Sequence, residues 1–281
     1  MTATTHDFQT WIDILEQDGT FVLKRTLRDL SRIDRDADQP DVAGVVSILE
    51  QDPLMTIILL RFLQKNRRHS QLDDVVQVDQ ALMMIGMQTF FTRVMDGLQT
   101  AEDQLKHNLP ALAGMLHTVK RATRAASYAR DWAIRQKDLS FELIRITALL
   151  HNFAEILLWL HAPEQMGEVH RLQVHDRARR TRDVQTEVLG FKVSDLQLEL
   201  ARRWNLPELL VHFMERNYTQ QRRIQTVVLA VNLARHSENG WNDAALPDDY
   251  REIGELLHMK PDDVMVLVQG DQVSTGYAGT T

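Results

Sequence analysis

Apolar residues recur at intervals of three and four along almost the whole chain, the spacing that places them on one face of an α-helix. Two such stripes run over residues 23–30 and 42–49. Asp52-Pro53 then marks a helix start, because the aspartate can cap free backbone amides and proline is tolerated at the first helical position. The next segment, residues 54–63, is apolar on most sides and predicts a central helix.

The same pattern predicts helices along the rest of the chain. We expect them over residues 79–85, 89–98, 112–133, 141–160, 195–204, 208–215, 224–236 and 247–258, with a last short one from residue 261. Gly86 suits a helix end that needs a left-handed residue, and Leu206-Pro207 ends a helix because the residue before proline leaves the helical region. Strand signals are scarce: residues 75–78 form the only short candidate, which we expect to be a loop or a helix edge.

A junction falls between residues 99 and 110, where polarity rises and the apolar period lapses. The sequence therefore predicts an all-α, two-lobed protein. An N-terminal helical extension covers residues 1–19, and one domain covers 20–275, with lobes over 20–98 and 110–275. Phe8, Trp11, Ile12 and Leu15 lie at helical spacing, which indicates that the extension packs on the body.

Composition is that of an ordinary globular protein: 281 residues, of which 44% are hydrophobic and 25% charged. The absence of cysteine excludes a thiol nucleophile, a zinc ribbon, an iron–sulfur centre and a disulfide framework, and it fits a reducing cytoplasm. The net charge of -7 argues against nucleic acid as the main partner. We expect no export signal and no membrane span, since residues 141–160 carry too many polar groups to face lipid.

His151-Asn152 is the most informative pair, because a metal-dependent hydrolase would place adjacent His and Asp residues in such an apolar segment. A divalent cation that activates water needs anionic oxygen as well as imidazole, and Asn152 offers only a neutral carbonyl oxygen. The simpler interpretation of His151 is a core histidine hydrogen-bonded to a carbonyl or to Asn152.

Several segments, taken in order, resemble the HDOD domain, a divergent relative of the HD phosphohydrolases found in bacterial signalling proteins. The resemblance runs from about Phe21 to about His236. The residues that carry it are Ile48-Leu49-Glu50-Gln51-Asp52-Pro53-Leu54, Leu59-Leu60-Arg61-Phe62-Leu63, Ala81-Leu82-Met83-Met84-Ile85-Gly86, Ala148-Leu149-Leu150-His151-Asn152-Phe153-Ala154 and Trp204-Asn205-Leu206-Pro207. The resemblance implies an all-helical HD-like fold and a module that relays signals through protein contacts.

The chain departs from the family pattern at one would-be site. The resemblance implies Asp where Asn152 stands, Gly at Ala154, Lys at Glu155 and paired histidines at Arg216-Asn217. A complete HD centre also needs an earlier histidine and a later aspartate, for which His117 and Asn232 are the nearest candidates. The resulting degenerate pocket of His117, His151, Asn152 and Asn232 offers two imidazoles and no anionic oxygen, so we expect no metal and no catalysis.

Two other groups of residues have a functional and a simpler interpretation. Arg177, Arg179, Arg180 and Arg182 could contact a phosphate or an acidic partner, although a solvated connection is the simpler interpretation. Met83-Met84 and Met87 could line an adaptable partner groove, although filling gaps in a helical core is the simpler interpretation.

The sequence thus predicts a non-enzymatic regulatory module, without cofactor, that acts in the cytoplasm on a signalling protein supplied in trans or as a self-associated form. The groove between the lobes and residues 83–98 are the expected contact surface. The alternative is a divergent metal-dependent phosphohydrolase, or a nucleotide-binding sensor, that uses the degenerate pocket. A transcription-associated factor is a third hypothesis.

Overall fold

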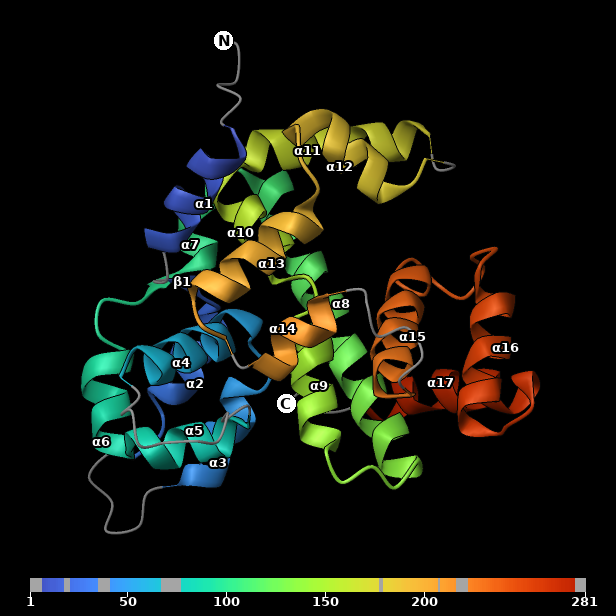
Figure 1. Cartoon of the computed structure of the whole chain (residues 1–281), viewed down its shortest axis with the longest axis horizontal. Coiled ribbons are helices and arrows are strands. Elements are labelled where there is room, and N and C mark those ends of the chain that lie inside the picture. The colour runs from blue at the N-terminus through green and yellow to red at the C-terminus, as the bar shows by residue number, and fades with distance from the viewer. Residues whose placement is uncertain are drawn as a thin grey trace. The chain divides into compact units, whose positions relative to one another are not determined.

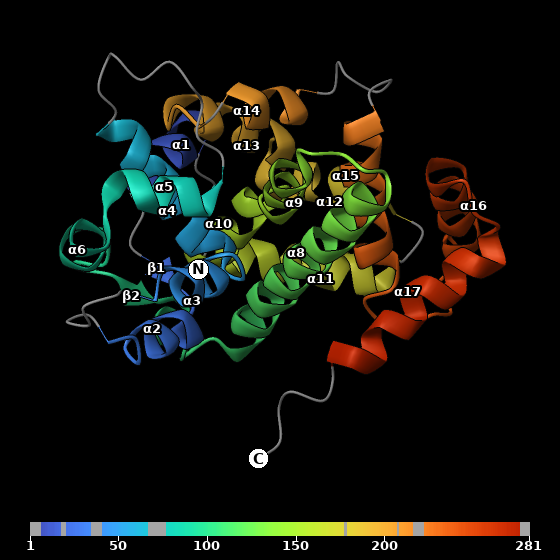
Figure 2. The ribbon, with the colours of Figure 1, turned by 90° about the horizontal axis from the view of Figure 1, so that it is seen from below.

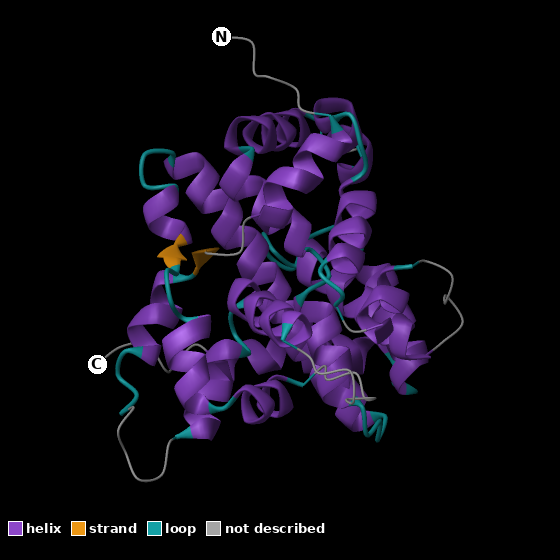
Figure 3. Ribbon diagram, turned by 60° about the vertical axis from the view of Figure 1, so that its left-hand side comes forward, coloured by secondary structure: helices purple, strands orange, loops and turns teal. Residues whose placement is uncertain are grey.

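The structure is a computed structural model that describes residues 7–17, 21–34, 41–66, 77–176, 179–206, 208–215 and 222–275. These residues are almost entirely helical (Figures 1 and 3), which confirms the predicted all-α class. The chain divides into two compact units, which we describe separately. Unit 1 comprises Met1–Lys120 and Asn152–Arg216, and unit 2 comprises Arg121–His151 and Asn217–Thr281.

Unit 1 contains the N-terminal elements, the first half of the longest helix and five later helices. Its elements are α1 (Phe8–Gln17), β1 (Phe21–Val22), α2 (Lys24–Leu30), α3 (Val42–Leu49), α4 (Pro53–Lys65), α5 (Val78–Ile85), α6 (Met87–Thr89), the π-helix η1 (Phe90–Val94), β2 (Gln99–Thr100), α7 (Ala101–Gln104), α8 (Leu109–Arg135) up to Lys120, α10 (Phe153–His161), α11 (Pro163–His175), α12 (Thr181–Leu189), α13 (Val193–Arg203) and α14 (Glu208–Met214).

Unit 2 contains the second half of α8 together with four further helices. These are α9 (Phe141–Leu149), α15 (Arg222–His236), α16 (Leu246–Leu257) and α17 (Pro261–Thr275). α15 packs against α9 and α16, and α16 packs against α17 (Figure 2). The predicted lobes, residues 20–98 and 110–275, divide the chain differently, because α10 to α14 group with the N-terminal segments.

Asp52 begins α4 as predicted, and its carboxylate organises the centre of unit 1. One oxygen accepts from the amides of Leu54 and Met55 at 2.9 and 3.2 Å, and the other accepts from the Leu23 amide and the Thr26 hydroxyl at 2.9 and 2.7 Å. Burial raises the pKa of Asp52, whereas these four hydrogen bonds oppose that rise. The fully buried side chain therefore joins the starts of α2 and α4.

α4 is buried on nearly every side from Pro53 to Leu60, which confirms the predicted central helix. Gly86, which follows α5, has a φ of +83°, so the expected need for a residue with positive φ is confirmed. α1 is also confirmed, because Trp11, Ile12 and Leu15 are no more than 4% exposed.

The structure breaks the helix predicted over residues 141–160. α9 ends at Leu149, a turn covers residues 150–152, and α10 begins at Phe153. Hydrophobic spacing missed the break because residues on both sides of it are buried, from Leu143 to Leu149 before it and from Ile156 to Leu160 after it. This turn carries His151 and Asn152, so the break sets their positions.

Other differences lie in short elements. Residues 89–98 do not form one α-helix, since α6 gives way to the π-helix η1. The expected junction over residues 99–110 contains β2 and α7, and β2 pairs in parallel with β1 (Figure 2). In this pairing Phe21 is the partner of Gln99. α11 and α12 are not predicted, and the last helix, α17, is 15 residues long rather than short. Residues 75 and 76 of the strand candidate lie outside the described residues, and Val78 begins α5.

The stretch Phe141–His161 is long and apolar enough to cross a membrane by length and composition alone, and its most apolar window is 83% buried inside the structure. α3 and α4 would meet the same criterion only as a single span, but their axes differ by 114°. Core helices meet the criterion equally well, so it is weak evidence for a membrane span.

Candidate functional site

The His151-Asn152 turn is held at the point where α10 begins. The Ala154 amide donates to the side-chain oxygen of Gln197 at 3.4 Å, and Gln197 is buried on α13. Asn152 is the residue before the helix, yet its own side chain makes no capping hydrogen bond. A side chain of α13 therefore caps the start of α10. The two helices begin 40 residues apart, at Phe153 and Val193.

Within unit 1, the segment that begins at Trp204 packs against the residue that follows the His151-Asn152 pair. Phe153, directly after the His151-Asn152 pair, lies 5.4 Å from the ring centre of Trp204. Trp204 is 6% exposed and follows the last residue of α13. The next residue, Asn205, has a φ of +48°, so the chain turns directly after α13. Pro207, the last residue of the predicted turn, lies outside the described residues.

A carboxylate lies one turn after Asn152, on α10. The Thr118 hydroxyl on α8 donates to the Gly114 carbonyl at 3.0 Å and to Glu155 Oε1 at 3.3 Å. Sequence reasoning treated Glu155 only as a departure from the family pattern and missed it as an anionic oxygen. The signal was present in the sequence, because Glu155 is a carboxylate three residues after Asn152.

The four residues of the predicted degenerate pocket belong to different units. His117 on α8 and Asn152 lie in unit 1, whereas His151 and Asn232 on α15 lie in unit 2. The pocket as a whole therefore stays a prediction. Among the residues that the structure describes, no group of three or more His, Cys, Asp or Glu side chains is placed to hold a metal ion.

Asn232 belongs to a polar cluster within unit 2. Arg235 Nη2 lies 3.5 Å from Asn232 Oδ1 and 3.1 Å from His236 Nε2. His236 Nδ1 lies 2.6 Å from Asp249 Oδ2, and Asp249 is 6% exposed. Because Arg235 only donates and Asp249 accepts, Nε2 of His236 is placed to accept and Nδ1 to donate. Asp249 lies in the first turn of α16, and His236 on α15 is its partner.

The predicted arginine group is divided between a loop and a helix. Arg177 lies outside the described residues, Arg180 directly precedes α12, and Arg182 lies within α12. Arg179 makes an ion pair with Glu187, which raises the pKa of the guanidinium, and Arg182 Nε lies 3.6 Å from Asp183. A phosphate at Arg179 or Arg182 would have to compete with these carboxylates.

The chain matches a known protein family over most of its length. The HDOD domain family matches residues 25–233. The chain belongs to the HDOD family, as its sequence segments indicated. α1 and the last two helices, α16 and α17, lie outside the matched residues.

Two solved structures show the same fold. The MmoQ response regulator from Methylococcus capsulatus has a TM-score of 0.63 and 16% sequence identity, over 89% of this chain and 97% of that chain. A virulence factor from Campylobacter jejuni has a TM-score of 0.67 and 16% identity, over 94% of this chain and 92% of that chain. At this identity the likeness concerns the fold alone. The search of curated proteins found no match.

Proposed function

We propose that this chain is a non-catalytic regulatory module that acts through protein contacts in a bacterial signalling pathway. The observation that carries the proposal is Asn152. In a chain of the HDOD family, the position beside His151 that would supply an anionic metal ligand carries an amide instead. An amide does not supply the charge that a hydrolytic metal centre takes from its aspartate.

One further fact supports a regulatory role, and a second concerns the metal centre. One protein of the same fold is named a response regulator and another a virulence factor. Glu155 is a remaining carboxylate near Asn152 in sequence, but it accepts a hydrogen bond from Thr118 and belongs to no described group of three metal-binding side chains. We place this function in the cytoplasm, with a signalling protein in trans as the partner.

The proposed contact surface includes α5 and the elements that follow it, up to residue 98. Met83 is 70% exposed and Met84 is 41% exposed on α5. Flexible, polarisable methionine side chains adapt to different partner surfaces, which explains their use at binding sites. The structure therefore favours a partner-binding role for Met83 and Met84 over the gap-filling alternative, since a core position would bury them.

The absence of catalysis is tested by comparing the wild-type chain with Asn152→Asp. Both are purified and assayed for bound iron, manganese and magnesium and for hydrolysis of phosphodiesters and nucleotides. The proposal expects no turnover by the wild-type chain. Metal-dependent turnover by the wild-type chain, abolished by chelation, would overturn it and support the phosphohydrolase alternative. A thermal shift with cyclic dinucleotides separates the sensor alternative, because a ligand that binds the native state raises its stability.

The partner-binding role is tested with matched surface variants. Met83→Glu places a charge on α5, and Val266→Glu places one at a similarly exposed position on α17, where Val266 is 68% exposed. Proteins from the native host are captured on wild-type and variant chains. We expect a signalling protein that is retained by the wild type and by Val266→Glu and lost with Met83→Glu. Equal retention by all three chains contradicts the assignment of this surface.

A further inference from the structure

α1 lies outside the part of the chain that matches the HDOD family, yet it is firmly packed in unit 1. The family match begins at residue 25, eight residues after α1 ends at Gln17. Trp11, Ile12 and Leu15 bury the apolar face of the helix, and α1 packs against α13. Phe8 meets Phe191, just before α13, in an edge-to-face contact at 5.4 Å.

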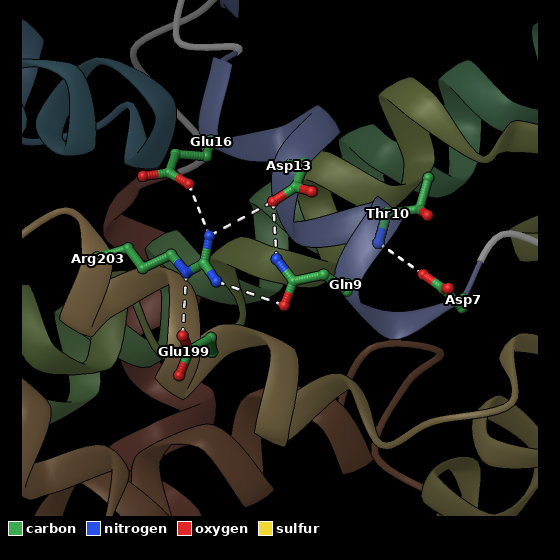
Figure 4. Close-up of polar contacts among 7 residues, drawn as sticks. All are labelled: Asp7, Gln9, Thr10, Asp13, Glu16, Glu199 and Arg203. Atoms are coloured by element: carbon green, nitrogen blue, oxygen red, sulfur yellow. Dashed lines mark hydrogen bonds and ion pairs between the residues drawn. The ribbon is translucent and has the colours of Figure 1, made fainter.

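The polar edge of α1 converges on one side chain of α13, Arg203 (Figure 4). The guanidinium lies 2.9 Å from Glu16 and 3.4 Å from Asp13 through Nη1, and 3.4 Å from Gln9 through Nη2. Its Nε donates to Glu199, on α13 itself, at 3.0 Å. These contacts raise the pKa of Arg203, with the hydrogen bond to Glu16 as the largest cause. α1 therefore presents an acidic edge to a cation at the last position of α13.

A second arginine joins the C-terminal end of α1 to the part of unit 1 that matches the HDOD family. Arg61 on α4 donates to the Glu16 carbonyl at 2.9 Å and lies 4.0 Å from the ring centre of Trp204. Trp204 is the residue that contacts Phe153, next to the His151-Asn152 turn. The surface under α1 is therefore continuous with the segments that carry the family resemblance.

These contacts define what kind of helix the surface accepts. A helix of 10 residues is marginal in water on its own, so α1 gains most of its stability from docking. Its ion pairs are partly exposed, with 30% of the Arg203 side chain and 54% of the Asp13 side chain accessible, and such pairs contribute little. The surface therefore fits a helix with two features. It carries apolar residues at the positions of Trp11, Ile12 and Leu15, and acidic residues at the positions of Asp13 and Glu16.

We propose that the α13 surface is a helix-binding surface that α1 occupies in cis, and that a signalling partner engages it with an amphipathic, acidic-edged helix that displaces α1. This inference rests on the proposed function. It adds a second partner-binding surface to the one that includes Met83, and it states the chemistry of the partner's helix. The acidic edge is argued from the charge of Arg203, and the apolar pattern from the side chains that α1 already buries there.

The test uses the full chain, and a synthetic peptide of residues 7–17 as the probe. Trp11→Ala with Leu15→Ala weakens docking of α1 in cis and leaves the α13 surface unchanged. A fluorescent peptide should bind this double variant at least about tenfold more tightly than it binds the wild-type chain, where α1 already occupies the surface. Adding Arg203→Ala should weaken peptide binding. The matched control is Arg202→Ala, because Arg202 is the neighbouring arginine on α13 and pairs with Glu215 at 2.5 Å.

Three outcomes would overturn the inference. The double variant could lose its helical circular dichroism, which would make α1 an integral part of the core. It could fold and fail to bind the peptide. It could also bind the peptide while the wild-type chain forms dimers through exchange of α1, detected by light scattering, which would make a second copy the occupant. None of these results bears on capture through Met83, so this inference and the proposed function fail separately.

Discussion

Replacement of Asp52 tests whether one buried carboxylate holds the centre of unit 1. Its oxygens accept hydrogen bonds from the amides of Leu23, Leu54 and Met55 and from the Thr26 hydroxyl, at 2.7 to 3.2 Å. The side chain is fully buried, so water cannot take over these donors in the folded state. Removing the carboxylate therefore leaves the starts of α2 and α4 without acceptors at the same time.

The magnitude follows from these contacts. Each hydrogen bond contributes about 1 kcal/mol net, so Asp52→Ala should lower the free energy of unfolding by about 4 kcal/mol. Asp52→Asn keeps one acceptor oxygen, but its NH2 group then faces either the Leu23 amide or the amides at the start of α4, which also donate. This substitution should lower the free energy of unfolding by about 2 kcal/mol. Asp41 caps α3 through a single hydrogen bond to the Gly44 amide at 2.8 Å and is exposed. As the matched control, Asp41→Ala should cost about 1 kcal/mol.

Urea unfolding followed by far-ultraviolet circular dichroism measures these differences, and hydrogen exchange of the Leu23 amide reports the loss locally. Thr26→Val provides a double-mutant cycle, because its cost should be smaller in the Asp52→Ala background than in the wild-type chain. The reasoning is wrong if Asp52→Ala costs no more than Asp41→Ala, or if the costs of Thr26→Val and Asp52→Ala simply add.

Three further substitutions have defined outcomes. Gly114→Ala should lower the free energy of unfolding by about 1 to 2 kcal/mol despite the better helix propensity of alanine, because the new Cβ would lie 2.4 Å from Trp159 Cζ2. Gly167→Ala is its control: nothing lies within 4 Å of that Cβ, so urea unfolding should show a gain of about 0.5 to 1 kcal/mol. Burial opposes ionisation of Asp138, but hydrogen bonds, above all from Arg223, outweigh it and lower its pKa. Asp138→Asn should therefore cost about 1 to 2 kcal/mol at pH 7, and the cost should shrink as the pH falls below about 4, through the lowered pKa. A cost that is the same at pH 7 and pH 3 would contradict this explanation.

The sequence alone determined those features that depend on local chemistry. Asp52-Pro53 indicated the start of α4 because capping and the fixed φ of proline act within a few residues. Gly86 indicated a positive φ for the same kind of reason. Periodicity found most helices, and the order of short segments identified the HDOD family, which matches residues 25–233.

Tertiary structure decided the features that depend on contacts between distant segments. The break at residues 150–152 is supported by Gln197 of α13, and hydrophobic spacing cannot show it because both flanking helices are buried. Phe21 pairs with Gln99 across 78 residues of chain, and two-residue strands are too short to produce an alternating pattern. His236 and Asp249 meet only because α15 packs on α16. Whether a segment forms a helix depends on residues that are close in the sequence. Which polar groups surround a site depends on how distant helices pack, and the order of residues along the chain does not show that packing.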